Sequence, residues 1–153
     1  MAVSNRDRIG KAFEILAEGL EPWIDGEMRA NAPSGADWIA AIVTAGKSPM
    51  QKVSTADPQF QLKVMWDHWN NVFSKVLGQN ERTYVSELRG VRNRWAHNDK
   101  FNFEDAHRTL DTIERLLTAI SSPLAESVNQ SRAELLEAKY AADNKANPAQ
   151  QAL

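Results

Sequence analysis

The sequence contains no cysteine among its 153 residues, so it can form neither a disulfide nor a metal site with thiolate ligands. This absence is typical of proteins in a reducing compartment, and we expect a cytoplasmic location. No run of apolar residues approaches the roughly 18 that a membrane-spanning helix needs. The charged residues at positions 6–8 argue against a cleaved signal peptide, so we expect no association with a membrane.

An excess of positive charge and glycine-rich loops are also lacking. The 18 Lys and Arg residues are outnumbered by 20 Asp and Glu residues, which gives a formal net charge of −2. Proteins that coat nucleic acid through bulk electrostatics are basic, so any contact with RNA here must use a local basic site. No glycine-rich phosphate loop is present, which excludes nucleotide hydrolysis by that kind of site. The histidines, His68, His97 and His107, stand at no recognisable metal-ligand spacing, so we expect neither a metal nor another cofactor.

Apolar residues recur at helical spacing along most of the chain, and no strand pattern or internal repeat is present. We therefore expect an all-α fold, an up-and-down helical bundle of about five or six helices. A first helix begins after Ser4 and should end or restart at Pro22, because proline has no backbone N–H to donate. Residues 37–45 form a short apolar helix, and residues 47–56 form the longest internal loop.

The second half of the chain carries clearer helix boundaries. Asp57 and Pro58 are typical of a helix start, and we expect that helix to run to Leu77. A further helix ends at the breaker Asn98-Asp99, and a new cap follows at residues 102–105. We divide the chain into a helical domain at residues 1–122, a C-terminal helix at residues 123–142, and a polar tail or linker at residues 143–153.

Residues 92–97 concentrate more chemistry than any other stretch. Their sequence is Arg-Asn-Arg-Trp-Ala-His, which places two cations, an amide, a large aromatic ring and a titratable base within six positions. On a continuous helix, Arg92 and His97 point about 140° apart. They converge only if the helix ends or distorts near Ala96, or if two copies of the motif meet across a dimer.

The pattern R-N-x-x-x-H at residues 92–97, followed by Asn98-Asp99 and a fresh helix start, resembles the signature of the HEPN superfamily. The flanking segments 86–91 and 103–117 are also similar to that family, and the subgroup they resemble most is the SWT-one-like HEPN domains. The resemblance spans residues 5 to 122. It implies a small all-α domain of a type that often forms homodimers and cuts RNA without a metal. Bacterial relatives occur as toxins and in anti-phage systems, so an antitoxin or a fused domain is a further expected partner.

Metal-independent RNA cleavage uses the ribose 2′-OH as the nucleophile on the adjacent phosphorus. It needs a base for that hydroxyl, an acid for the leaving 5′-oxygen, and cations for the charge that builds on the phosphate. Histidine can supply the base or the acid near neutral pH, and an arginine fork matches two phosphate oxygens. We predict His97, Arg92 and Asn93 as catalytic residues, and Arg94 and Arg89 as RNA-binding residues. The resemblance implies products with a 2′,3′-cyclic phosphate and a 5′-OH.

Other hypotheses stay open. His97 could only cap the end of its helix, and Arg92 could pair with Glu87 or Glu104. Arg94 could contact a neighbouring acid instead of RNA. The family also contains domains that bind or dimerise without cutting, so the main alternative is a non-catalytic dimerisation or RNA-binding module of a larger protein. A plain helical interaction adaptor is a third possibility.

A second conspicuous stretch is Trp66-Asp67-His68-Trp69. We interpret Trp66 and Trp69 as part of the core stripe of their helix, and Asp67 and His68 as its outer face. Ser86 and Glu87 could border a groove near the motif.

Overall fold

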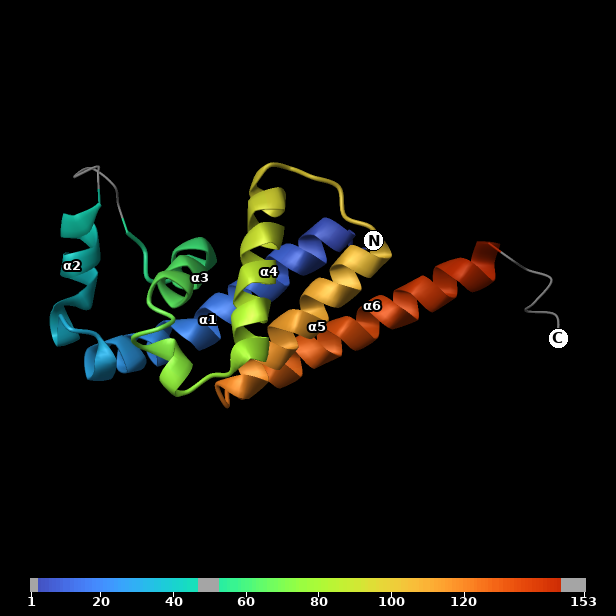
Figure 1. The fold of residues 1–153 in the computed structure, drawn as a ribbon. Coiled ribbons are helices and arrows are strands. Elements are labelled where there is room, and N and C mark those ends of the chain that lie inside the picture. The colour runs from blue at the N-terminus through green and yellow to red at the C-terminus, as the bar shows by residue number, and fades with distance from the viewer. Residues whose placement is uncertain (1–2, 47–52, 147–153) are drawn as a thin grey trace.

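The computed structural model describes residues 3–46 and 53–146 (Figure 1). Within these ranges the chain forms six α-helices and two short 3-10 helices and no strand, which confirms the predicted all-α helical bundle. The elements are α1 (Asn5–Asn31), η1 (Gly35–Asp37), α2 (Trp38–Ala45), α3 (Pro58–Asp67), η2 (Phe73–Lys75), α4 (Gln79–Ala96), α5 (Phe103–Ala119) and α6 (Ala125–Ala146).

The long helix α1 runs through the centre of the molecule, and α3, α5 and α6 all pack against it (Figure 1). The prediction that Pro22 ends the first helix is wrong, because α1 continues to Asn31. The carbonyl of Glu18 loses its N–H donor at Pro22, but both residues are exposed and water can serve instead. Leu20 and Ile24 meanwhile continue the buried stripe, and burying such side chains stabilises the helix by about 1.5–3 kcal/mol each.

The predicted helix from Pro58 to Leu77 is also interrupted. α3 ends at Asp67, and a turn leads into η2. The exposed residues Asn70 and Asn71 lie in this turn, where asparagine side chains compete with helical hydrogen bonding. Trp69, Val72 and Phe73 are nevertheless buried, because the turn still directs them into the core.

The core is one cluster that all six helices share. α1 and α5 contribute its central rows, and the buried residues Val128 and Leu135 bring α6 against them. The largest fully buried side chains are Trp38, Phe73, Ile9, Leu16, Leu20, Met28, Leu62, Met65, Leu88, Leu110, Ile113 and Leu116.

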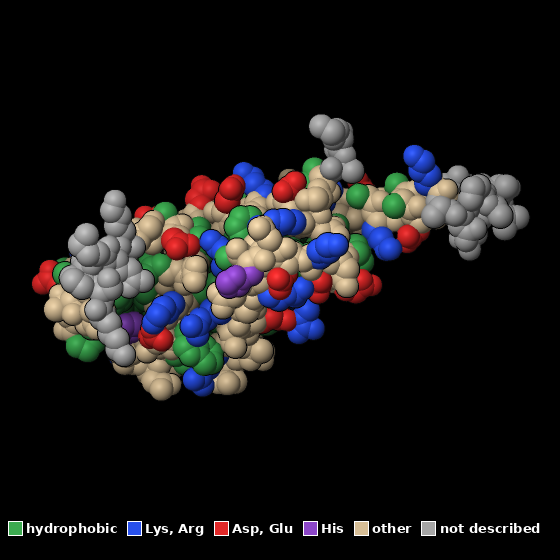
Figure 2. Space-filling model, turned by 90° about the horizontal axis from the view of Figure 1, so that it is seen from above, with side chains coloured by type: hydrophobic (Ala, Val, Ile, Leu, Met, Phe, Trp, Pro, Cys, Tyr) green, Lys and Arg blue, Asp and Glu red, His purple; other side chains and the backbone are tan. Residues whose placement is uncertain are grey.

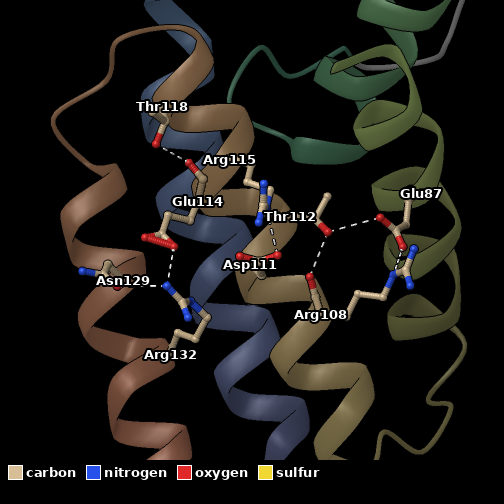
Figure 3. A network of polar contacts seen from close by, with 9 residues as sticks. All are labelled: Glu87, Arg108, Asp111, Thr112, Glu114, Arg115, Thr118, Asn129 and Arg132. Atoms are coloured by element: carbon tan, nitrogen blue, oxygen red, sulfur yellow. Dashed lines mark hydrogen bonds and ion pairs between the residues drawn. The ribbon is translucent and has the colours of Figure 1, made fainter. Parts of the chain in front are cut away.

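Polar contacts join α4 to α5 and α5 to α6 (Figure 3). The carboxylate of Glu87 on α4 accepts hydrogen bonds from Arg108 and, at 3.1 Å, from the buried Thr112 hydroxyl on α5. Glu114 on α5 accepts from Arg132 on α6 at 2.9 Å. The contacts of Glu87 hold α4, the helix that carries the motif, against α5.

Several predicted boundaries agree with the structure, and others do not. Asn102 and Asp105 form a reciprocal capping box at the start of α5, as their spacing predicts. α6 runs to Ala146, past the predicted end of the C-terminal helix at residue 142. Residues 47–52 of the predicted loop and residues 147–153 of the predicted tail lie outside the described residues. No helix in the described ranges is long and apolar enough to cross a membrane.

Candidate functional site

α4 ends inside the motif. His97 is its C-terminal cap, and the His97 backbone N–H donates to the carbonyls of Asn93 and Arg94 at 3.1 and 3.2 Å. The next residue, Asn98, has a φ of 60°, a left-handed conformation that asparagine tolerates better than most residues. The predicted break at Asn98-Asp99 is therefore present, and the chain turns there towards α5.

Asn93 and His97 lie one turn apart on the solvent side of α4. Both side chains are exposed, and neither makes a hydrogen bond or ion pair within residues 3–46 and 53–146. Arg89, one turn earlier, is half-buried and lies on the same side, since four helical residues turn the direction by only about 40°. This face therefore offers an imidazole, an amide and a cation to whatever approaches α4.

Arg92 points to the other side of α4, towards α1 and the residues before α3. Its side chain is 18% exposed, and a guanidinium nitrogen lies 4.0 Å from a carboxylate oxygen of Asp57. The alternative in which Arg92 pairs with Glu87 or Glu104 is not observed, because Arg108 binds Glu87 and the turn of α4 directs Arg92 towards Asp57. Nη1 of Arg92 is buried and has no acceptor among the described residues.

The Arg92 guanidinium lies in a groove of about 430 Å³ between α1 and the start of α3. The floor is apolar, and three glutamates of α1 line it together with Arg92. A phosphate bound here would meet these carboxylates as well as the guanidinium, so the groove as formed does not favour anions. The lining residues are Gly10, Phe13, Glu14, Ala17, Glu18, Glu21, Ala56, Pro58, Arg92 and Trp95.

Arg94, predicted to bind RNA or a neighbouring acid, has acids around it. Its guanidinium lies 3.5 Å from Asp99 and 3.6 Å from Asp105, and it donates to the carbonyl of Lys100 at 3.3 Å. It also lies over the ring of Phe101. In this arrangement Arg94 closes the turn between α4 and α5, and its charge is largely balanced.

The structure does not bring the predicted catalytic residues together within one chain. Asn93 and His97 share an exposed face, whereas Arg92 lies in the groove, and no hydrogen bond or ion pair joins Arg92 to His97 in the described chain. Among the described residues, no group of three or more His, Asp and Glu side chains could hold a metal ion.

Sequence reasoning missed one cationic and aromatic cluster. Trp66 on α3 is half-buried rather than fully in the core, and the guanidinium groups of Arg82 and Arg89 lie over its ring. The seven-residue spacing of the two arginines on one helix face was the available signal. The other half of the cluster, Trp66, depends on how α3 packs on α4. Figure 2 shows Lys and Arg side chains mixed with Asp and Glu on the face seen from above, so any nucleic-acid contact there must be local.

The comparisons with known proteins give one match. A family model described as Swt1-like HEPN matches residues 11–121, which include all of α4 and the whole motif. Neither a curated protein nor a solved structure showed significant similarity to the chain.

Proposed function

Because the chain belongs to the Swt1-like HEPN family, we propose that it is a metal-independent endoribonuclease that acts as a homodimer. The observation that carries this proposal is the exposed pair of Asn93 and His97 at the end of α4. The His97 imidazole has no partner within the described residues, so it is available to exchange a proton with a substrate. α4 itself is held firmly by its contacts with α3 and α5, which suits a catalytic group that must be positioned.

In the proposed reaction, the His97 imidazole takes the proton of the ribose 2′-OH, and the 2′-oxygen forms a bond to the adjacent phosphorus. The bond from phosphorus to the 5′-oxygen breaks, and that oxygen receives a proton from the protonated imidazole of the second copy. Asn93 donates a hydrogen bond to a phosphate oxygen. To contact the same phosphate, the Arg92 side chain has to leave the glutamate-lined groove and its contact with Asp57, which at 4.0 Å is long for an ion pair. The products are a 2′,3′-cyclic phosphate and a 5′-OH.

Such an activity suits a toxin or an effector of anti-phage defence. An enzyme that cuts RNA without a cofactor needs restraint in its host cell, and an antitoxin or a fused domain would supply it. This biological role is part of the proposal and rests on the family alone.

A second function is favoured by the position of Arg92. Its guanidinium is largely buried, lies near Asp57 and faces glutamates, as expected for an arginine with a structural role. The corresponding hypothesis is a non-catalytic HEPN module that dimerises or binds RNA for a larger protein.

Cleavage of RNA in the presence of EDTA separates the two functions. The parent chain is compared with His97→Ala and Arg92→Ala, and the ends of the products are mapped. Cleavage by the parent with cyclic phosphate ends, and its loss in the folded His97→Ala variant, supports the nuclease. A dimeric parent that leaves RNA intact, even at high protein concentration, contradicts it and supports the module.

A further inference from the structure

The arginines without a carboxylate partner share one property. In the described chain, Arg6, Arg82 and Arg89 make no ion pair, and each lies over a tryptophan ring. Arg82 and Arg89 share Trp66, with their guanidinium carbons 4.9 Å and 5.7 Å from the ring centroid. Two uncompensated cations are thus held beside one aromatic side chain.

The surface around this cluster is hollowed and positively charged. A pocket of about 440 Å³ is lined by Trp66, Gln79, Arg82, Thr83, Ser86, Glu87 and Arg108. Glu87 is the only acid among these residues, and Arg108 and Thr112 already bind it (Figure 3). Nε of Arg82 is buried and has no acceptor among the described residues. The pocket therefore carries an excess of positive charge.

This cluster lies on the same face of α4 as His97. Arg82, Ser86, Arg89, Asn93 and His97 follow one another at spacings of three or four residues, so they fall within a band of about 80° on the helix surface. None of the five is acidic, and all are exposed or half-buried. From Arg82 to His97 the band is about 22 Å long, at 1.5 Å of helix rise per residue.

We propose that Trp66, Arg82 and Arg89 form a docking site for single-stranded RNA, and that the bound strand continues along α4 to His97. The guanidinium groups bind backbone phosphates, and a base stacks on the Trp66 ring or on an arginine plane held against it. Because such contacts use only the phosphate and the π-face of a base, the site takes RNA with little sequence preference. The inference takes its substrate, RNA, from the proposed function. It adds the residues that bind the strand at a distance from the bond that is cleaved.

An entirely structural role for the cluster makes a different prediction. A cation–π contact that only stabilises the fold would affect unfolding and leave RNA affinity unchanged. An acidic protein segment is the other ligand that two free arginines attract, and a polyglutamate peptide represents it in the experiment.

The experiment measures binding of a fluorescein-labelled single-stranded RNA of mixed sequence by anisotropy over a series of salt concentrations. The full chain carries His97→Ala throughout, so that the RNA stays intact. Arg82→Gln/Arg89→Gln removes the two cations. Arg29→Gln/Arg115→Gln is the matched control, because it removes two exposed arginines that lie in other ion pairs. Circular dichroism shows whether each variant is folded. Arg82→Lys/Arg89→Lys, which keeps both positive charges, is the second variant in case the glutamine variant does not fold.

We expect the Arg82→Gln/Arg89→Gln variant to bind RNA about tenfold more weakly, with a slope of log Kd against log salt reduced by about 1.4 for two lost phosphate contacts. The lysine pair should keep most of the salt slope, and the control should match the parent within about twofold. Quenching of tryptophan fluorescence by RNA should fall in Trp66→Phe. Equal RNA affinity in the parent and in the glutamine variant overturns the inference. A chain that binds a polyglutamate peptide but does not bind RNA overturns it as well.

The outcome remains separate from that of the nuclease proposal. A chain with His97 intact that binds RNA through this cluster but never cuts it keeps the inference and loses the proposed activity. A chain whose cleavage rate and KM are unchanged by Arg82→Gln/Arg89→Gln keeps the activity and loses the inference.

Discussion

The indole N–H of Trp95 donates a hydrogen bond to the backbone carbonyl of Arg6 at 3.1 Å, and the Arg6 guanidinium lies 4.4 Å from the centroid of the same ring. Arg92 lies 5.0 Å from that centroid. The first turn of α1 therefore holds the aromatic residue of the motif, and through it the end of α4.

Replacing Trp95 tests this anchoring. Trp95→Phe keeps an aromatic ring but loses the hydrogen bond, and we expect the free energy of unfolding to fall by about 1 kcal/mol. Trp95→Ala also removes the packed ring, and the loss should reach about 3 kcal/mol. Urea unfolding measures both values. A phenylalanine variant as stable as the parent would show that the hydrogen bond to Arg6 adds nothing.

Two glycines of α1 should respond to alanine in opposite directions. A Cβ at Gly10 would lie 2.9 Å from the Trp95 ring, whereas a Cβ at Gly26 meets nothing within 4 Å. We expect Gly10→Ala to destabilise the protein by about 1–3 kcal/mol through overpacking. Gly26→Ala should stabilise it by about 0.5–1 kcal/mol, since alanine favours the helix. Thermal unfolding of the two variants side by side checks the difference, and equal midpoints would contradict it.

Stability should depend on the ionisation of Asp25 at low pH. The hydrogen bond from the buried Trp38 indole at 3.0 Å, followed by contacts with Arg29, lowers the pKa of the Asp25 carboxyl despite the opposing effect of burial. A lowered pKa stabilises the fold above the unfolded value of about 3.9, and this stabilisation is lost as the pH falls further. Asp25→Asn keeps an acceptor for Trp38 but cannot titrate.

We therefore expect the parent to be more stable than Asp25→Asn at neutral pH, and the gap to narrow below about pH 4. Thermal midpoints measured across this range provide the test. If the difference in thermal midpoint between the parent and Asp25→Asn stays constant down to pH 2, another group is responsible for the loss of stability at low pH.

Removing the charge of Asp57 should release Arg92. Asp57 caps α3 by accepting from the Gln59 N–H at 3.0 Å, and asparagine is an equally good cap. Asp57→Asn should leave stability unchanged and tighten RNA binding by about 0.5–1 kcal/mol, or two- to fivefold in Kd.

Asp57→Ala, which also removes the cap, should lower the free energy of unfolding by about 1 kcal/mol. Anisotropy with labelled RNA and urea unfolding give the two readouts. Unchanged RNA affinity in Asp57→Asn would indicate that Arg92 does not reach the RNA.

Local signals in the sequence were sufficient for the fold class and for several helix ends. Ser4 accepts from the Asp7 N–H, and the cap at Asn102 and the break at Asn98 are where the residue types predict them, because each depends on a few neighbouring backbone groups. Pro22 and the end of α3 were mispredicted for the opposite reason. Whether a missing hydrogen bond or an asparagine pair ends a helix depends on exposure and packing, which the local sequence does not contain.

The candidate site divides in the same way. The sequence indicated the motif and the end of its helix, and Ser86 and Glu87, which from the sequence could border a groove, line a hollow. It did not indicate that Asp57 lies near Arg92, nor that Arg82 and Arg89 lie over the ring of Trp66. Both contacts depend on how α3 packs against α4. Contacts between residues far apart in the chain leave no periodic trace in a single sequence.

The close approach of Gly10 to Trp95 also has an evolutionary consequence. The two positions occupy one volume, so a larger residue at position 10 is tolerated only when the ring at position 95 becomes smaller. Glycine at position 10 should therefore be replaced mainly in related chains that have lost the tryptophan of the motif. Covariation between positions 10 and 95 in an alignment of related chains would therefore show how closely α1 and α4 must pack for the motif to keep its conformation.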